Sequence, residues 1–256
     1  MVSWNVNSVR ARLPYLELAL KEREWELLAL QETKVPDSEF PESFFKRFGY
    51  RCFYHGQKAY NGVAVCSKLS PEGVIKGWPD GEEDERRIIT VSFKEFTLVN
   101  VYVPRGGEKG SERHAFKIYF LTKLKLFLEE NFSPRTPLLV VGDFNVARSE
   151  LDVYDPLVWR GRPGFMEDER EAFEELLSFG LTDLYRRFHP DEPGFTWWDI
   201  ESGGFSTDRG IRIDYCLATE PMAERATGCE VLREFRRKRG SLLPSDHAPL
   251  LATFKL

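Results

Sequence analysis

The chain has 256 residues, of which 42% are hydrophobic and 30% are charged, and its formal net charge is -5. This length and balance allow one large α/β domain, or two small ones, with a sizeable core, and they exclude a disordered or low-complexity chain. No apolar run reaches the ~18 residues that a membrane helix needs, and no signal-peptide pattern precedes the first core-like residues. We therefore expect a cytoplasmic protein that does not bind membranes.

The charges are unevenly distributed along the chain. Residues 82–85 are all acidic, and the segment 233–239 is mostly basic. A negative net charge alone argues mildly against a nucleic acid ligand, but a local basic face allows an acidic protein to bind DNA. Either charged run, taken alone, is also explained as a solvated loop.

The four cysteines are Cys52, Cys66, Cys216 and Cys229. None belongs to a Cys-x-x-Cys pair, and all four lie in apolar, strand-like surroundings. Such surroundings favour buried free thiols over zinc ligands or disulfides. We expect four free cysteines.

Apolar runs alternate with helical patterns along the whole chain. Several runs are continuously apolar, as expected of strands that are covered on both faces. The longest helical pattern has an apolar stripe of Phe116, Phe120, Leu124 and Phe127. Because no linker or repeat is present, the pattern predicts one domain of mixed sheets with helices packed outside. The expected strands are 2–6, 27–31, 63–66, 88–93, 97–103, 138–141, 211–218 and 250–254, and the expected helices are 12–22, 112–130 and 167–179.

Most of these strands end in a carboxylate, an amide or a phenol. Strands that share a sheet can bring their ends together at one edge, so we expect these side chains to form a single cluster. An oxygen-rich cluster with one imidazole and no thiolate suits a hard cation such as Mg²⁺ or Mn²⁺. The reaction that such a cation supports at a phosphate is phosphoryl hydrolysis. The cluster residues are Asn5, Glu32, Tyr102, Asp143, Asn145, Asp214, Asp246 and His247, with Asn7 just beyond Asn5.

Each of these residues also has a simpler explanation. Asn and Asp after a strand are common turn residues. Tyr102 is consistent with a half-buried core phenol, and the Asp-His pair before the last strand with a satisfied polar pair. The simpler explanation requires six strand ends to close in the same way for unrelated reasons, so we favour the common site.

In chain order, these segments resemble the motifs of exonuclease III-type abasic endonucleases, a branch of the endonuclease/exonuclease/phosphatase superfamily. The first motif lies at 3–10 around Asn5, the second lies at 30–34 around Glu32, and Gly-Asp-Phe-Asn stands at 142–145. Any one motif alone is weak, whereas the ordered series covers essentially the whole chain. The other similar segments are 54–58, 61–64, 86–89, 100–104, 209–214 and 244–249.

The resemblance implies a fold and a metal site. The fold is a four-layer α/β sandwich, in which two packed mixed β-sheets are flanked by helices. The cofactor is one or two Mg²⁺ or Mn²⁺ ions, with Glu32 as the main ligand. The other members of the implied metal set are Asn5, Asn7, Asp143, Asn145, Asp246 and His247.

The same resemblance implies catalytic roles. Asp143 resembles the group that orients or deprotonates the attacking water, with Asn145 beside it. His247 resembles the imidazole that binds the scissile phosphate, with its ring oriented by Asp214, and Tyr102 the phenol that contacts the same phosphate. These roles agree with the chemistry, because spreading charge over phosphate oxygens requires a cation and several donors.

The resemblance also implies a substrate pocket beside the catalytic cluster. Trp197, Trp198, Ile211 and Ile213 are similar to the family's pocket for the flipped-out abasic sugar. A flat apolar slot fits a sugar without a base and excludes one that carries a base. The alternative is an ordinary sandwich core. The residues expected to contact DNA are Arg105, Lys117, Arg160, Arg162, Arg236 and Arg237.

Three positions depart from the family pattern. Ser8 stands where the family usually has Gly, which puts the turn there in question. Arg105 stands where relatives have Gln or Asn facing the minor groove, and the stretch 153–164 is shorter than in the enteric bacterial enzyme. Duplex contacts at these two places are therefore expected to differ.

The resemblance implies a hydrolase that incises duplex DNA 5′ to abasic sites, with 3′→5′ exonuclease and 3′-end-trimming activity, in base excision repair. We expect a monomer whose partner is double-stranded DNA with abasic sites or 3′ ends. One alternative is a superfamily enzyme acting on inositol phosphates, sphingomyelin or poly(A), which is not expected to share the tryptophan pair. The other is a catalytically dead binding module, although Glu32, Asp143, Asp214 and His247 are all present.

Overall fold

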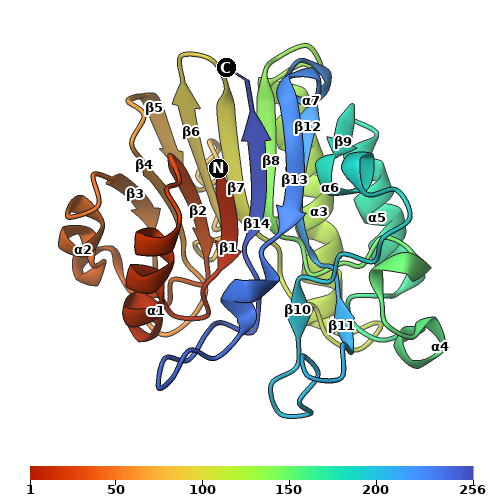
Figure 1. Ribbon diagram of the computed structural model, residues 1–256. Helices are drawn as coiled ribbons and strands as arrows, with labels where there is room; N and C mark the ends of the chain where they lie inside the picture. Colours follow the sequence, from red (N-terminus) through yellow and green to blue (C-terminus); the bar gives the residue numbers. More distant parts are fainter. Residues whose placement is uncertain (256) are drawn as a thin grey trace.

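The computed structural model describes residues 1–255. Two six-stranded mixed β-sheets pack face to face, and helices cover both outer faces (Figure 1). The four-layer sandwich expected from the sequence is therefore confirmed. Within the described residues, no helix is long and apolar enough to cross a membrane.

The first sheet is built around a parallel pair, β1 and β2, and its other strand pairs are antiparallel. Helices α1 (Val9–Glu22) and α2 (Glu42–Lys46) cover its outer face. In spatial order its strands are β13 (Ala226–Val231), β14 (Leu250–Phe254), β1 (Val2–Asn5), β2 (Leu27–Gln31), β4 (Val63–Ser67) and β3 (Arg51–His55).

The second sheet also contains one parallel pair, β7 and β8. Helices α3 (Glu112–Asn131) and α5 (Glu167–Leu177) cover its outer face. In spatial order its strands are β5 (Pro71–Lys76), β6 (Ile88–Phe93), β7 (Thr97–Tyr102), β8 (Leu138–Asp143), β12 (Asp214–Thr219) and β9 (Leu181–Asp183). The remaining elements are α4 (Pro156–Trp159), α6 (Leu184–Phe188), α7 (Glu220–Arg225), the short ribbon of β10 (Trp197–Trp198) and β11 (Gly210–Ile211), and the 3-10 turns Asp37–Glu39, Glu150–Asp152 and Arg233–Arg236.

Burial on both faces explains why the strands read as continuous apolar runs. In β2, Leu27 and Ala29 lie in the core between the two sheets, whereas Leu28 and Leu30 lie in the core under α1 and α2. Successive side chains of a strand point to opposite faces, so both sets must be apolar when both faces are covered.

The structure corrects two boundaries expected from the sequence. The run 211–218 divides into β11 and β12, which belong to different sheets, because residues 212 and 213 leave the ladder. The helix expected at 12–22 begins at Val9, and Ser8 caps it by accepting a hydrogen bond from the Ala11 N–H. Ser8 adopts φ 84°, a conformation that favours glycine, so its side-chain cap offsets a strained backbone.

The expectation of four free cysteines is wrong for one pair. Cys52 of β3 and Cys66 of β4 form a disulfide, whereas Cys216 and Cys229 are free and buried as expected. The register of the hairpin pairs Cys52 directly with Cys66. Residues 51–55 are not among the strands that the sequence pattern predicts, so the pattern does not indicate this cross-strand pairing.

Candidate active site

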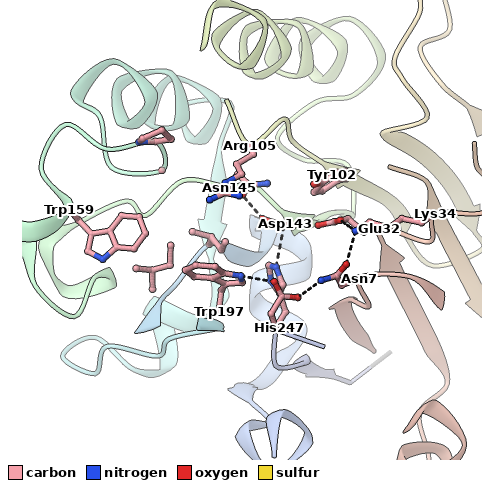
Figure 2. A pocket seen from close by; sticks show the side chains of 15 residues that line it. Asn7, Glu32, Lys34, Tyr102, Arg105, Asp143, Asn145, Trp159, Trp197 and His247 are labelled. Atoms are coloured by element: carbon pink, nitrogen blue, oxygen red, sulfur yellow. Dashed lines mark hydrogen bonds and ion pairs between the residues drawn. The ribbon is translucent and has the colours of Figure 1, made fainter. Parts of the chain in front are cut away.

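The strand ends that carry polar side chains meet at one edge of the sandwich. Asn5, Tyr102 and Asp143 are the last residues of β1, β7 and β8, and Asp214 opens the antiparallel neighbour β12 opposite Asp143. Glu32 directly follows β2. The expected polar side chains are therefore gathered at one place, and Figure 2 shows those that line the cavity, among them Glu32, Asp143 and His247.

A chain of short contacts links four ionisable side chains in this cluster. Asp214 Oδ2 lies 2.8 Å from His247 Nδ1, and His247 Nε2 lies 3.7 Å from Asp143 Oδ2. The amide of Asn5 then donates to both Asp143 Oδ2, at 2.9 Å, and Glu32 Oε1, at 2.8 Å. The Asp214 contact fixes the His247 ring with its Nε2 facing Asp143.

Two pKa shifts reflect the crowding of buried carboxylates around one imidazole in this cluster. Burial and the charge of Asp214 raise the pKa of Asp143 to about 8. Burial lowers the pKa of His247, but Asp214 and Asp143 outweigh it and raise that pKa to about 10. A divalent cation beside Asp143 would favour its ionised form. Glu32, Asp143 and His247 each offer one ligand atom within 4.8 Å of the others, so the donor set fits a cation.

Asn5 and Asn7 occupy the places expected from the sequence but make different contacts. Asn5 turns its amide nitrogen toward the two carboxylates, while its Oδ1 accepts the Asn7 N–H at 3.0 Å. It therefore bridges two prospective ligands, Glu32 and Asp143. Asn7 lines the cavity, and its amide donates to Asp246 Oδ1 at 3.0 Å.

Lys34 is a member of the site that the sequence reading did not single out. Its Nζ lies 2.8 Å from Glu32 Oε2 and donates to Asn7 Oδ1 at 2.6 Å. Glu32, Lys34 and Asn7 all have positive φ values, of 51°, 55° and 43°. Three neighbouring residues in this disfavoured region mark a backbone that is held in place to present their side chains.

Tyr102, at the end of β7, and Asn145, on the loop after β8, flank Asp143. The Asn145 N–H donates to Asp143 Oδ1 at 2.9 Å, and its side-chain amide donates to the Val103 carbonyl. Burial, followed by the charges of Glu32 and Asp143, raises the pKa of Tyr102 well above its usual value. The phenol is therefore a protonated hydrogen-bond donor at neutral pH.

The cluster forms one end of a cavity of about 260 Å³, and the other end is largely apolar. Trp197, Ile211 and Ile213 line that end as expected, together with Trp159. The rings of Trp159 and Trp197 pack edge to face, with 6.5 Å between their centroids (Figure 2). The sequence reading missed Trp159, although this residue lies in the stretch 153–164 that departs from the family pattern.

Trp198 does not line the cavity, so that part of the expected slot is wrong. It is 0% exposed and packs against Phe195, Phe205 and Ala248. The cause is the alternation along β10, which sends Trp197 and Trp198 to opposite faces. The indole of Trp197 is instead tied to the charged end, because its Nε1 donates to Asp246 Oδ2 at 2.9 Å.

Two of the six residues expected to contact DNA are buried. Lys117 is 0% exposed and pairs with Glu169. Arg236 is 8% exposed, and its guanidinium donates to the carbonyls of Asp246 and Trp198. Both expectations are wrong, because a cation can be buried where carboxylates or carbonyls surround it. The residues that remain exposed are Arg105, which also lines the cavity, Arg160, Arg162 and Arg237.

Comparison with known proteins places the chain among nucleases. The profile of the Endonuclease/Exonuclease/phosphatase family matches residues 2–247. Exodeoxyribonuclease III of Haemophilus influenzae is 34% identical over 99% of this chain and 99% of its own length. An exodeoxyribonuclease of Bacillus subtilis is 32% identical over 98% of this chain and 97% of its own length.

Solved structures agree with these relatives. An AP endonuclease from Archaeoglobus fulgidus superposes with a TM-score of 0.95 at 36% identity, covering 100% of this chain and 98% of that one. A 3′ phosphatase from Neisseria bound to a product DNA hairpin superposes with a TM-score of 0.94 at 34% identity, with the same coverage. The match therefore extends over the whole fold and includes a protein with DNA in place.

Proposed function

The chain belongs to the endonuclease/exonuclease/phosphatase family, and on this premise we propose that it is a metal-dependent DNA phosphodiesterase of base excision repair. It incises duplex DNA 5′ to abasic sites and also removes nucleotides or blocking groups from 3′ ends. The relatives that support this proposal are exodeoxyribonucleases and an AP endonuclease.

The observation that carries the proposal is the joining of two unlike surfaces in one cavity. Carboxylates and an imidazole at one end suit a phosphodiester, and the apolar slot at the other end suits a sugar without a base. Trp197 belongs to both, because its ring walls the slot and its N–H donates to Asp246. A substrate that carries a phosphate next to a bare sugar fits this arrangement.

Each polar residue has a role that follows from its contacts. Glu32 and Asp143 would hold Mg²⁺ or Mn²⁺ through their carboxylates. When bound, such a cation neutralises charge that develops on the phosphate oxygens. Asp143, fixed by the Asn145 N–H and the Asn5 amide, orients or deprotonates the attacking water.

Two further groups stabilise the phosphate by donating hydrogen bonds. The charges of Asp214 and Asp143 raise the pKa of His247 to about 10, so both ring nitrogens carry a proton at neutral pH. Nδ1–H donates to Asp214, and Nε2–H is available to a phosphate oxygen. The phenol of Tyr102 is a second donor on the same side of the cavity as Glu32 (Figure 2). Fixed donors aimed at developing charge are a major source of rate enhancement.

The duplex itself is bound outside this cavity. Arg105 at the rim and Arg160 and Arg162 on the loop after α4 are exposed and positively charged. We propose that they contact phosphates or the minor groove around the lesion, and that the enzyme acts as a monomer.

A time course on one labelled duplex with a central abasic site tests the function. Incision at the lesion and shortening from the 3′ end give products of different length, so one gel reports both activities. A soluble inositol phosphate serves as the competing substrate. Release of phosphate from it, without cleavage of the duplex, would replace the proposed function by that of another member of the family.

A further inference from the structure

Behind the wall of the active-site cavity, Lys117 of α3 and Glu169 of α5 form an ion pair with no exposed surface. Lys117 Nζ lies 2.7 Å from Glu169 Oε1, and both side chains are 0% exposed. Burying two charges costs about as much as their attraction returns, so stability alone is weak support for such a pair. Its other contacts indicate a different role.

Lys117 holds the backbone of two residues that line the cavity. Besides Glu169, its ammonium donates to the carbonyl of Asn145 at 2.7 Å and to the carbonyl of Arg105 at 3.3 Å. An ammonium has three donors, so these three acceptors use all of them. The loop after β7 and the loop after β8 are thus fastened to one buried nitrogen.

Glu169 holds a third wall of the same cavity. Its Oε2 accepts the Gly164 N–H at 2.7 Å and the Met166 N–H at 3.3 Å. Gly164 lines the cavity beside Trp159, and its carbonyl accepts the Ala147 N–H at 2.7 Å. The loop that completes the apolar slot is therefore fixed to the same ion pair.

The packing around the pair leaves little room for movement. A Cβ on Gly106 would lie 2.9 Å from Lys117 Cδ and 3.3 Å from Glu169 Oε1, so the loop after β7 rests directly on both side chains. Asn145 has φ 52°, and its N–H donates to Asp143 Oδ1. Asn145 therefore links Lys117 to the carboxylate of Asp143, which is proposed to orient the water.

We propose that the Lys117–Glu169 pair is a positioning element of the active site, an inference that rests on the proposed function. The pair sets Asn145, Arg105 and Gly164 relative to one another through three backbone contacts. In doing so it fixes the spacing between the charged end of the cavity and the apolar slot. A pair that only fastened α3 to α5 would affect unfolding but not the turnover of folded enzyme.

The test compares Lys117→Met with a control that weakens the same helix packing. Lys117→Met keeps most of the stem and removes all three donors. Leu176→Ala lies on α5 in the core shared with α3, and loss of a buried leucine costs about 2–5 kcal/mol. Its side chain forms no hydrogen bond to any of the three loops. Both variants are assayed below their melting temperatures on the abasic duplex and on a recessed 3′ end.

Lys117→Met is expected to lower kcat by ~10-fold or more on both substrates with a smaller change in KM, because misplacement of about 1 Å has large effects on rate. Leu176→Ala is expected to lower the melting temperature and to keep kcat within about twofold, since no positioned group is touched. If Lys117→Met instead matches Leu176→Ala, the pair is structural only.

Glu169→Gln provides a second, nearly isosteric variant if Lys117→Met does not fold. Its side chain can accept from Lys117 or from Gly164 but not from both, so one loop is released. We expect a loss of kcat of roughly several-fold without a matching loss of duplex affinity. Unchanged kcat in this variant overturns the inference. Wild-type protein that cleaves neither substrate overturns the proposed function instead, so the two failures are distinguishable.

Discussion

The two ends of the cavity differ in how the fold builds them. At the charged end, Asn5, Asp143 and Asp214 stand on interior strands of the two sheets. Asn5 donates to Asp143 across the sandwich, and Asp214 contacts His247. At the apolar end, Trp197 and Trp159 come from a two-residue strand and a four-residue helix between long loops. The reacting groups are therefore fixed by the core, whereas the slot is fixed by loops.

This difference assigns the two ends different tasks. Every nucleotide in DNA has a phosphate, so the charged end alone cannot distinguish an abasic site from its neighbours. The apolar end offers shape but few polar groups, so it cannot cleave. We infer that the charged end carries out cleavage and that the apolar end selects the site. Substitutions at one end should therefore alter one of these properties without altering the other.

Chelation is expected to have the largest effect, because it removes the charge that balances Glu32 and Asp143. Cleavage of an abasic duplex should be lost in EDTA and return with Mg²⁺ or Mn²⁺. Binding of the duplex should persist, since the exposed arginines contribute to it without the ion. Full cleavage in EDTA would remove the charged end from the mechanism.

The second-largest effect on cleavage is expected for Asp143→Asn. The change keeps the size of the side chain and removes its charge and basicity, so kcat should fall by ~10²-fold or more. Duplex affinity should change little. Steady-state kinetics together with a binding titration check both parts, and a kcat within a few-fold of wild type would show that Asp143 does not activate the water.

A smaller effect is expected from the exposed arginines of the loop beside the slot. If each arginine neutralises one phosphate, Arg160→Gln and Arg162→Gln should each make the negative slope of log affinity against log salt concentration shallower by about 0.9. Arg236→Gln is the matched control from the basic run, since this residue is buried on two carbonyls. A slope that changes for Arg236→Gln but for neither loop arginine would reverse the assignment.

The smallest effect on activity is expected far from both ends, at the Cys52–Cys66 disulfide. The two cysteines are separated by 14 residues in sequence. The loss of unfolded-state entropy on closing a loop of this length is expected to add about 3 kcal/mol to the free energy of unfolding. Cys66→Ser, or reduction of wild type, should therefore lower the denaturant midpoint while kcat stays the same. A large loss of kcat in folded, reduced protein would connect this hairpin to the site.

The charged end was predictable from the sequence, and the apolar end was only partly so. Glu32, Asp143 and His247 follow or precede long apolar strands, so the edge where they meet is set by topology. Trp197 and Trp198 lie in a strand of two residues, which is too short for an alternation pattern to show which one faces the cavity.

Other misjudged residues share one cause, which is that their partners are distant in sequence. Lys117 and Arg236 were expected on the surface because charged residues usually are. Their partners, Glu169 and the Trp198 carbonyl, lie 52 and 38 residues away. Pairing Cys52 with Cys66 similarly depends on the register of β3 against β4. Trp159 lies in a helix of four residues, which is too short to show a periodic pattern in the sequence.

The division of tasks is tested most directly by kcat/KM on matched duplexes that carry an abasic site, a uracil or a normal base at one position. Trp197→Ala should reduce the preference for the abasic site by ~10-fold, because the opened slot has room for a base and the bare sugar loses apolar contact. A tenfold change corresponds to about 1.4 kcal/mol. Trp197→Phe retains a ring but not the bond to Asp246, so it should keep most of the preference. Asp143→Asn should lower cleavage of all three duplexes by the same factor. An unchanged preference in Trp197→Ala, or a preference altered by Asp143→Asn, would contradict the assignment of choice to one end and cleavage to the other.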